Sequence, residues 1–243
     1  NSTDWGEETL LNNSFRYQHD FSAQGGSDNV SYYFNLGVTQ DDGLLKSGDI
    51  NYTKFNFRSN VSAKLTNNVT ATFNIAAFTD KRQSPIWNMF NIWRGTVSSL
   101  PINPVYANNN PAYLHRVQDG QAMNPVAIAQ SDLTGYARNE DNVFQTAFDL
   151  NYEVPYVKGL ELKAKVGYDP RFSQAKSLAK DFVLYDYDLE NDAYDETAFN
   201  KPAWIRNDYN NSKLLTLQAQ ANYKTTIADN HNVAGLFVFE QRE

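Results

Sequence analysis

A two-residue alternation of apolar and polar side chains is the feature that most constrains how this chain can fold. In residues 30–39 the apolar positions are Val30, Tyr32, Phe34, Leu36 and Val38. Successive side chains of a β-strand point to opposite faces, so this run predicts a strand with one apolar face. The abundance of aromatic residues, with fifteen Tyr and fifteen Phe, also favours β structure.

Similar runs recur along the chain and predict an all-β fold. They lie at about residues 14–24, 30–39, 52–65, 69–78, 143–154, 160–169, 213–224 and 233–243. The turn at residues 25–29 contains Gly25 and Gly26, which can adopt positive φ, together with Asp28 and Asn29, which can hydrogen-bond the local backbone. We therefore expect an antiparallel meander of about eight strands.

The lengths of the connections alternate along this meander. Short turns follow the first, third, fifth and seventh strands, whereas the second is followed by residues 40–51 and two long loops are expected at about residues 79–142 and 170–211. All long connections then lie at one end of the sheet. Outer-membrane β-barrels have this asymmetry, with apolar outward faces, so the pattern favours a segment of a large transmembrane barrel. A half-exposed sheet in a soluble β-sandwich gives the same alternation and stays open as an alternative.

Composition excludes several kinds of function. The net charge is −7 and no cluster of Lys and Arg is present, which argues against binding to nucleic acid. The chain has no cysteine, hence no disulfide, thiolate metal site or cysteine nucleophile. Without a recognisable catalytic or nucleotide-binding motif, we expect neither an enzyme nor a cofactor.

Aromatic side chains in the two long loops are the best candidates for ligand binding. Sugar rings stack on aromatic planes while Asn and Asp bind their hydroxyl groups, and these loops contain both kinds of residue. The candidates are Trp87, Trp93, Tyr106, Tyr113, Trp204 and Tyr209. The alternative is that these residues anchor the loops or contact a partner protein.

Metal binding has weak support in the sequence. His19, His115 and His231 lie on separate segments without the spacing of metal ligands. A calcium loop would use alternate carboxylates, as in the run Asp186, Asp188, Glu190 and Asp192, but the glycine expected at its turn is absent. A solvated acidic loop is the simpler interpretation.

Several short segments in the first eighty residues resemble one family. These segments are Thr3-Asp4-Trp5, Gly25-Gly26-Ser27-Asp28-Asn29, Ser31-Tyr32-Tyr33-Phe34-Asn35-Leu36-Gly37, Asp42-Gly43-Leu44-Leu45-Lys46 and Lys54-Phe55-Asn56-Phe57-Arg58-Ser59-Asn60-Val61. In this order and spacing they resemble the SusC/RagA-like TonB-dependent transporters of Bacteroidetes outer membranes. The similarity is densest over residues 3–80 and continues loosely to residue 243.

This resemblance implies a large barrel in the bacterial outer membrane, closed around an N-terminal plug and powered through the TonB complex. Such transporters import glycans or peptides under a surface lipoprotein of the SusD type, and their outer surface contacts membrane lipid. Residues 1–243 would then be part of the barrel domain, without the plug, and the end strands would pair with neighbours outside this chain. The alternative function remains a soluble carbohydrate-binding module.

Overall fold

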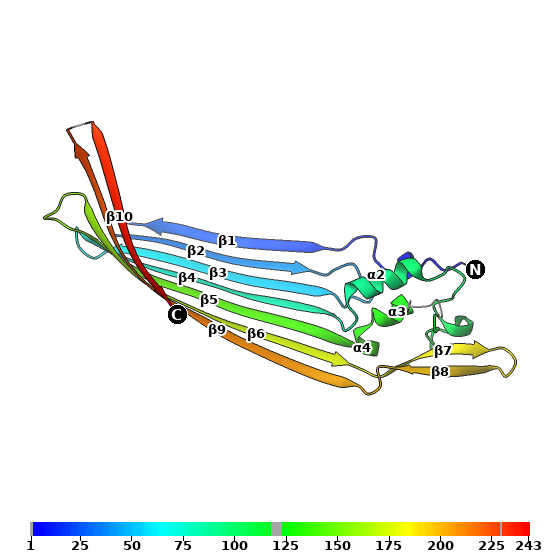
Figure 1. Cartoon of the computed structure of the whole chain (residues 1–243). Helices are drawn as coiled ribbons and strands as arrows, with labels where there is room; N and C mark the ends of the chain where they lie inside the picture. Colours follow the sequence, from blue (N-terminus) through cyan, green and yellow to red (C-terminus); the bar gives the residue numbers. More distant parts are fainter. Residues whose placement is uncertain (1, 118–122, 229) are drawn as a thin grey trace.

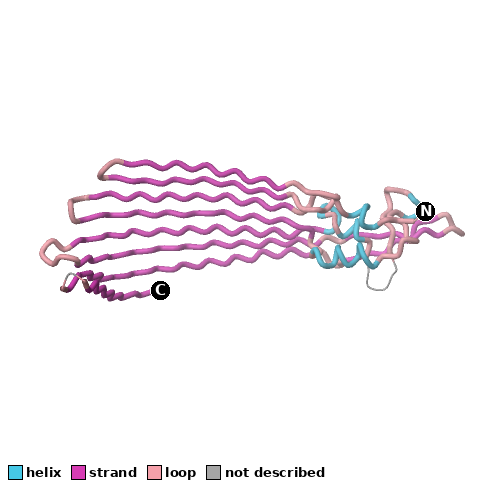
Figure 2. The backbone as a smooth tube through the Cα atoms, turned by 90° about the horizontal axis from the view of Figure 1, so that it is seen from above, coloured by secondary structure: helices cyan, strands magenta, loops and turns pink. Residues whose placement is uncertain are grey.

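The computed structural model describes residues 2–117, 123–228 and 230–243, and its main feature is a long eight-stranded antiparallel sheet (Figures 1 and 2). Strands follow the order β1-β2-β3-β4-β5-β6-β9-β10, so each strand lies beside its neighbours in sequence except where β7 and β8 intervene. The strands are β1 Arg16–Gly26, β2 Val30–Asp41, β3 Asn51–Lys64, β4 Val69–Pro85, β5 Gly135–Glu153, β6 Leu160–Ala179, β9 Trp204–Ile227 and β10 His231–Arg242. The sheet is open, with β1 and β10 at its edges, and the predicted meander is confirmed.

The two long loops are shorter than the sequence predicted. β4 continues to Pro85 and β5 begins at Gly135, so strand occupies both ends of the expected loop at residues 79–142. β6 likewise continues to Ala179 and β9 begins at Trp204, within the expected loop at residues 170–211. The alternation of hydrophobicity stops here because polar residues occupy both faces, although backbone pairing continues unbroken in register.

Pro170 lies inside β6, at a position where a loop was expected from the sequence. A proline has no N–H to donate to a neighbouring strand, so it usually interrupts a ladder. Here pairing between β5 and β6 is interrupted at Asp169 and Pro170 and resumes at Arg171 in the same register. The Asp169 carboxylate accepts the Thr146 N–H at 3.1 Å, which compensates for part of the interruption.

Short helices and a hairpin gather at the end of the sheet that carries the long connections (Figure 1). They are α1 Trp5–Thr9, α2 Met89–Ser98, the 3-10 turn η1 Ala107–Asn109, α3 Pro125–Ile128, α4 Ser131–Thr134 and the hairpin of β7 Phe182–Asp188 with β8 Ala193–Phe199. In the described part of the chain, no helix has the length and apolar character needed to span a membrane.

The hydrophobic core lies in this loop region and not along the sheet. One cluster joins Leu45, Ile92, Ile128 and Ala129, while others join Trp5 with Val105 and Val117, and Ala127 with Phe182 and Leu184. These residues come from connections far apart in sequence, so packing ties the loops into one cap, which we call the loop cap. At the other end of the sheet, the four connections are short turns (Figure 2).

Candidate functional site

One face of the sheet is apolar and exposed across all eight strands. The register places Leu36 opposite Phe21 and Phe57, and Phe148 opposite Phe73 and Val166, so apolar side chains line up from strand to strand. Phe21, Phe73 and Phe148 are 63%, 45% and 46% exposed. Among the described residues, no second layer covers this face, which is the reverse of a soluble domain that buries such a surface.

The opposite face is polar and forms an open groove. A cavity of about 600 Å³ is lined by residues of β3, β4, β5, β6, β9 and β10, so this face is concave. Its polar lining residues include Arg58, Asn60, Asn74, Gln145, Lys165, Asp169, Thr216, Gln218, Glu240 and Arg242. Both charge signs are present together with several amides, so the groove can bind neutral polar molecules through many hydrogen bonds.

Hydrogen bonds between strands order the side chains of this polar face. The Asp149 carboxylate accepts from the Asn74 amide at 3.3 Å and lies 3.5 Å from Lys163 Nζ. Near β10 the Gln218 amide donates to Glu240 at 2.7 Å, and Glu240 also pairs with Arg242 at 2.7 Å. These contacts hold the groove wall in a defined polar arrangement.

Asn124 organises the loop cap through four hydrogen bonds. Its side chain is fully buried, and its amide donates to the carbonyls of Val105 at 3.0 Å and His115 at 2.9 Å. Its carbonyl oxygen accepts the N–H groups of Val126 and Ala127, which caps the start of α3. One side chain therefore joins three segments above the sheet.

Two of the predicted ligand-binding aromatics are packed within the loop cap. Trp87 lies against the cluster around Ile92, and its indole Nε1 is buried without a hydrogen-bond partner among the described residues. Tyr106 packs against the cluster of Trp5, Val105 and Val117. Both positions fit the alternative interpretation that these residues anchor loops.

Tyr113 belongs to an aromatic cluster with the β7–β8 hairpin. Its ring stacks on Tyr194 with centroids 3.9 Å apart and meets Tyr185 edge to face at 4.8 Å. The neighbouring Tyr187 hydroxyl donates to Asp192, which raises the pKa of Tyr187, and Tyr187 also contacts Tyr194. The cluster fixes the hairpin to the segment that carries Tyr113.

Trp93, Trp204 and Tyr209 have exposed rings but do not share one site. Trp93 lies on α2 beside Phe90 and is 51% exposed, whereas Trp204 is at the start of β9. Tyr209 projects from β9, where its hydroxyl accepts from the Gln174 amide at 3.4 Å. The six predicted aromatics are thus divided among the loop cap, the hairpin, α2 and β9.

The acidic run of the hairpin makes local contacts. Asp186 pairs with Arg116 at 2.5 Å and lies 3.9 Å from His115 Nδ1. Asp188 accepts from the Asn191 amide and from the N–H of Glu190, which lowers the pKa of Asp188. Within residues 2–117, 123–228 and 230–243, no three His, Cys, Asp or Glu side chains form a group that could hold a metal. His19 on β1 and His231 on β10 lie at opposite edges of the main sheet, and His115 lies outside this sheet, in an isolated bridge with Tyr185.

The residues of the polar groove were not among the candidates predicted from the sequence. The groove includes Arg58, Lys165 and Gln218, which occupy polar positions in strands with an apolar–polar alternation. Only the curvature of the sheet brings β3 near β10. In each strand the polar side chains occupy every second position, and this pattern could have identified the groove residues.

Comparison with known proteins relates this chain to TonB-dependent receptors by sequence. No family model matches the sequence. The chain is 25% identical over 177 residues to TonB-dependent receptor P26 of Formosa agariphila, an alignment that covers 72% of this chain and 16% of that receptor. The expected resemblance to TonB-dependent outer-membrane transporters is confirmed.

Solved structures show the same fold. The RagAB peptide transporter superposes with a TM-score of 0.73 at 19% sequence identity, covering 99% of this chain and 25% of the matched chain. The RagAB peptide importer in its 'open-open' state gives a TM-score of 0.74 at 18% identity, covering 98% of this chain and 25% of that chain. The fold is therefore that of a segment of a TonB-dependent transporter barrel, and this chain spans only a minor part of the length of its relatives.

Proposed function

We propose that this chain forms part of the barrel wall and outer loops of an outer-membrane, TonB-dependent importer. The observation that carries the proposal is the single sheet with an exposed apolar face and a concave polar face. Lipid provides an apolar environment for the first face, and a wet lumen suits the second. The likeness in sequence to a TonB-dependent receptor supports the same assignment.

The imported substrate in this proposal is a glycan or another oligomeric nutrient, including peptides. Amide and charged side chains line the groove at Asn60, Asn74, Gln145, Lys165 and Gln218, and these groups bind hydroxyls and peptide groups equally well. The RagAB relatives are peptide transporters by name. Partners would be a SusD-like surface lipoprotein at the loop cap and the TonB complex on the periplasmic side, without nucleic acid or an enzymatic step.

A soluble carbohydrate-binding β-sandwich is the alternative. A sandwich requires a second sheet packed on the apolar face. In the described part of the chain, the strands outside the main sheet form only the β7–β8 hairpin, which pairs within the loop region. This arrangement favours the barrel wall.

Replacing Phe148 with arginine tests the lipid-facing assignment. Phe148 lies in the middle of the apolar face, between Phe73 and Val166, and a cation near the bilayer midplane costs about 2–4 kcal/mol. We expect the Phe148→Arg variant of the full-length protein to show a lower unfolding midpoint in lipid vesicles. The matched Gln145→Arg variant adds the same charge to the same strand on the polar face and should leave the midpoint close to wild type. Equal effects of the two variants would contradict the assignment.

Uptake measurements test the transport function itself. Cells lacking the gene should fail to accumulate a fluorescent oligosaccharide or oligopeptide that wild-type cells take up, and loss of TonB should give the same defect. Unchanged uptake of both classes of oligomer would overturn the proposal.

Two aromatic substitutions separate ligand contact from loop anchoring. Trp93 is half exposed on α2, so Trp93→Ala should reduce substrate affinity by roughly 0.5–1.5 kcal/mol if the ring stacks on substrate, with little change in stability. Tyr113→Ala removes the stacking with Tyr194 and should instead loosen the β7–β8 hairpin. Limited proteolysis of the hairpin and binding isotherms measure the two effects, and unchanged affinity of Trp93→Ala would exclude it as a ligand contact.

A further inference from the structure

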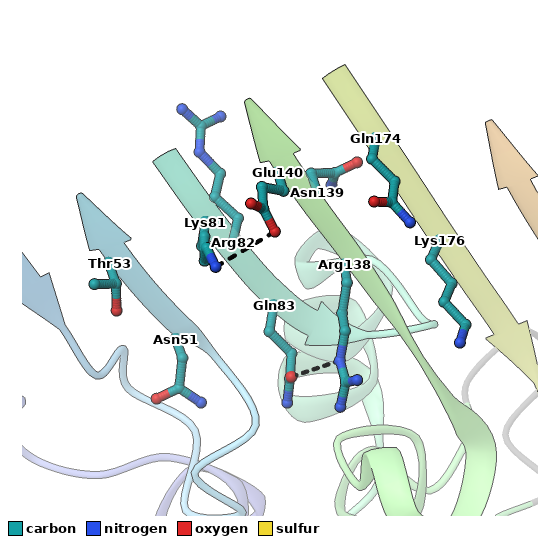
Figure 3. Close-up of a pocket in the computed structure, with 10 residues that line it drawn as sticks. All are labelled: Asn51, Thr53, Lys81, Arg82, Gln83, Arg138, Asn139, Glu140, Gln174 and Lys176. Atoms are coloured by element: carbon teal, nitrogen blue, oxygen red, sulfur yellow. Dashed lines mark hydrogen bonds and ion pairs between the residues drawn. The ribbon is translucent and has the colours of Figure 1, made fainter. Parts of the chain in front are cut away.

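A second pocket lies on the outer surface of the sheet, at the loop ends of β3 to β6 (Figure 3). Its volume is about 310 Å³. The register shows that it continues the apolar face: Phe55 pairs with Thr79, Thr79 with Asn142, and Asn142 with Phe172. Two residues further along each strand, the next row contains Lys81, Glu140 and Gln174. The pocket thus begins about 7 Å beyond the last row of apolar rings.

Cations in this pocket outnumber anions. Glu140 Oε2 lies 3.5 Å from Lys81 Nζ, which compensates one charge. Arg138 Nε donates to the neutral Gln83 amide at 2.8 Å, and its guanidinium lies over the Tyr136 ring at 4.1 Å. Figure 3 shows Lys81 directed at Glu140, and Arg138 at Gln83.

Arg138 and Lys176 are direct partners in the register of β5 and β6. Like charges in this position repel each other and destabilise a sheet. In the described part of the chain, neither side chain has a carboxylate within ion-pairing distance, so the pocket carries two cations without compensating charge. A bound anion would remove this repulsion.

The location indicates which anion. If the apolar face lies in lipid, a site about one row beyond the last rings lies at the level of the lipid headgroups. Tyr209, which is 69% exposed on the same outer surface, and Tyr136 beneath Arg138 are placed as in the aromatic girdle of a membrane barrel. Arg and Lys together bind phosphate oxygens through charge-assisted hydrogen bonds.

We propose that Arg138 and Lys176 form a binding site for the phosphorylated headgroup of an outer-leaflet lipid. Arg138 and Lys176 hold the phosphate between β5 and β6, at the register position that they share. This inference rests on the proposed membrane location of the apolar face.

Native mass spectrometry of the full-length protein in detergent tests the site. The probes are lipid A with its phosphates, the same lipid after the phosphates are removed, and inorganic phosphate alone. We expect wild-type protein to bind phosphorylated lipid A at least about tenfold more tightly than the dephosphorylated lipid. The double variant Arg138→Gln with Lys176→Gln should lose this preference, whereas Lys158→Gln, which removes a cation from a short turn at the opposite end of the sheet, should keep it.

Several results would overturn the inference. Equal binding of the two lipids, or retention of the preference in the double variant, excludes a phosphate site in this pocket. Full competition by millimolar inorganic phosphate would assign the pocket to free phosphate and not to lipid. Co-purification of a stoichiometric protein that the double variant releases would assign it to a protein partner. The double variant should still fractionate with the outer membrane. If the barrel assignment were wrong, the wild-type protein would be absent from that fraction, so the two failures are distinguishable.

Discussion

Replacing Gly159 with alanine is expected to disrupt the turn between β5 and β6 and its contact with β9. Gly159 has a φ of +87°, and an added Cβ would lie 1.9 Å from the carbonyl oxygen of Lys224. The Lys224 N–H also donates to the Gly159 carbonyl at 2.9 Å, so the turn cannot move away without losing this hydrogen bond. We expect a loss of more than about 4 kcal/mol in the free energy of unfolding, because left-handed strain adds to a backbone clash.

Two other glycines provide controls for this variant. Gly48 has a φ of +71°, but no atom lies within 4 Å of the point that an added Cβ would occupy, so Gly48→Ala should cost only the conformational strain of about 1–2 kcal/mol. Gly235→Ala, with neither a left-handed φ nor a nearby atom, should leave stability almost unchanged. Denaturant unfolding of the full-length protein in detergent measures all three, and a Gly159→Ala midpoint equal to that of Gly48→Ala would show that the turn relaxes freely.

Replacing Asn124 with alanine should loosen the loop cap. The substitution leaves the His115 carbonyl without its donor, and the Val105 carbonyl keeps only the His115 N–H at 2.9 Å. It also removes the cap from two N–H groups of α3. Each unsatisfied buried group costs about 1–3 kcal/mol, so a local loss of about 4 kcal/mol is expected. Hydrogen exchange in residues 102–117 and 123–134 should accelerate by at least about a hundredfold, while exchange in β3 and β4 stays unchanged.

Asn124→Asp and Asn88→Ala separate the parts of this effect. Aspartate keeps the acceptor for the N–H groups of α3 but loses both donors. Hydrogen exchange should therefore accelerate less in α3 than it does in Asn124→Ala, and as strongly near Val105 and His115. Asn88 caps α2 through one exposed hydrogen bond of 2.9 Å, and its removal should cost about 1 kcal/mol. An Asn124→Ala effect as small as that of Asn88→Ala would mean that water replaces the lost bonds.

The alternation of side chains was enough to predict the main sheet. Every predicted strand is present. The first turn is shorter than expected, because Gly25 and Gly26 lie within β1 and are not among the glycines with positive φ. The prediction succeeded because a period of two is imposed locally by strand geometry and needs no tertiary information. The prediction of strand ends failed beyond Phe78, before Val143 and after Asp169. The paired strands there carry polar residues on both faces, so the apolar–polar pattern no longer indicates a strand.

Contact of the six aromatic candidates with a ligand stays a prediction, because sequence reasoning could not separate binding from packing. Aromatic residues in loops serve packing as readily as binding, and Trp87 and Tyr106 pack against core clusters formed by Ile92 and Val105. Sequence spacing carries no record of such contacts, because the partners come from different connections. The polar groove and the basic outer pocket were missed since each combines strands separated by many residues.

The sequence by itself determined the strand order and which alternate positions of each strand are apolar. It also determined which end of the sheet carries the long connections. These properties follow from local periodicity and turn chemistry. The tertiary structure decided which polar side chains face each other and how the loops pack around Asn124. It also decided that Arg138 and Lys176 lie side by side, because register and sheet curvature arise only when distant strands pair.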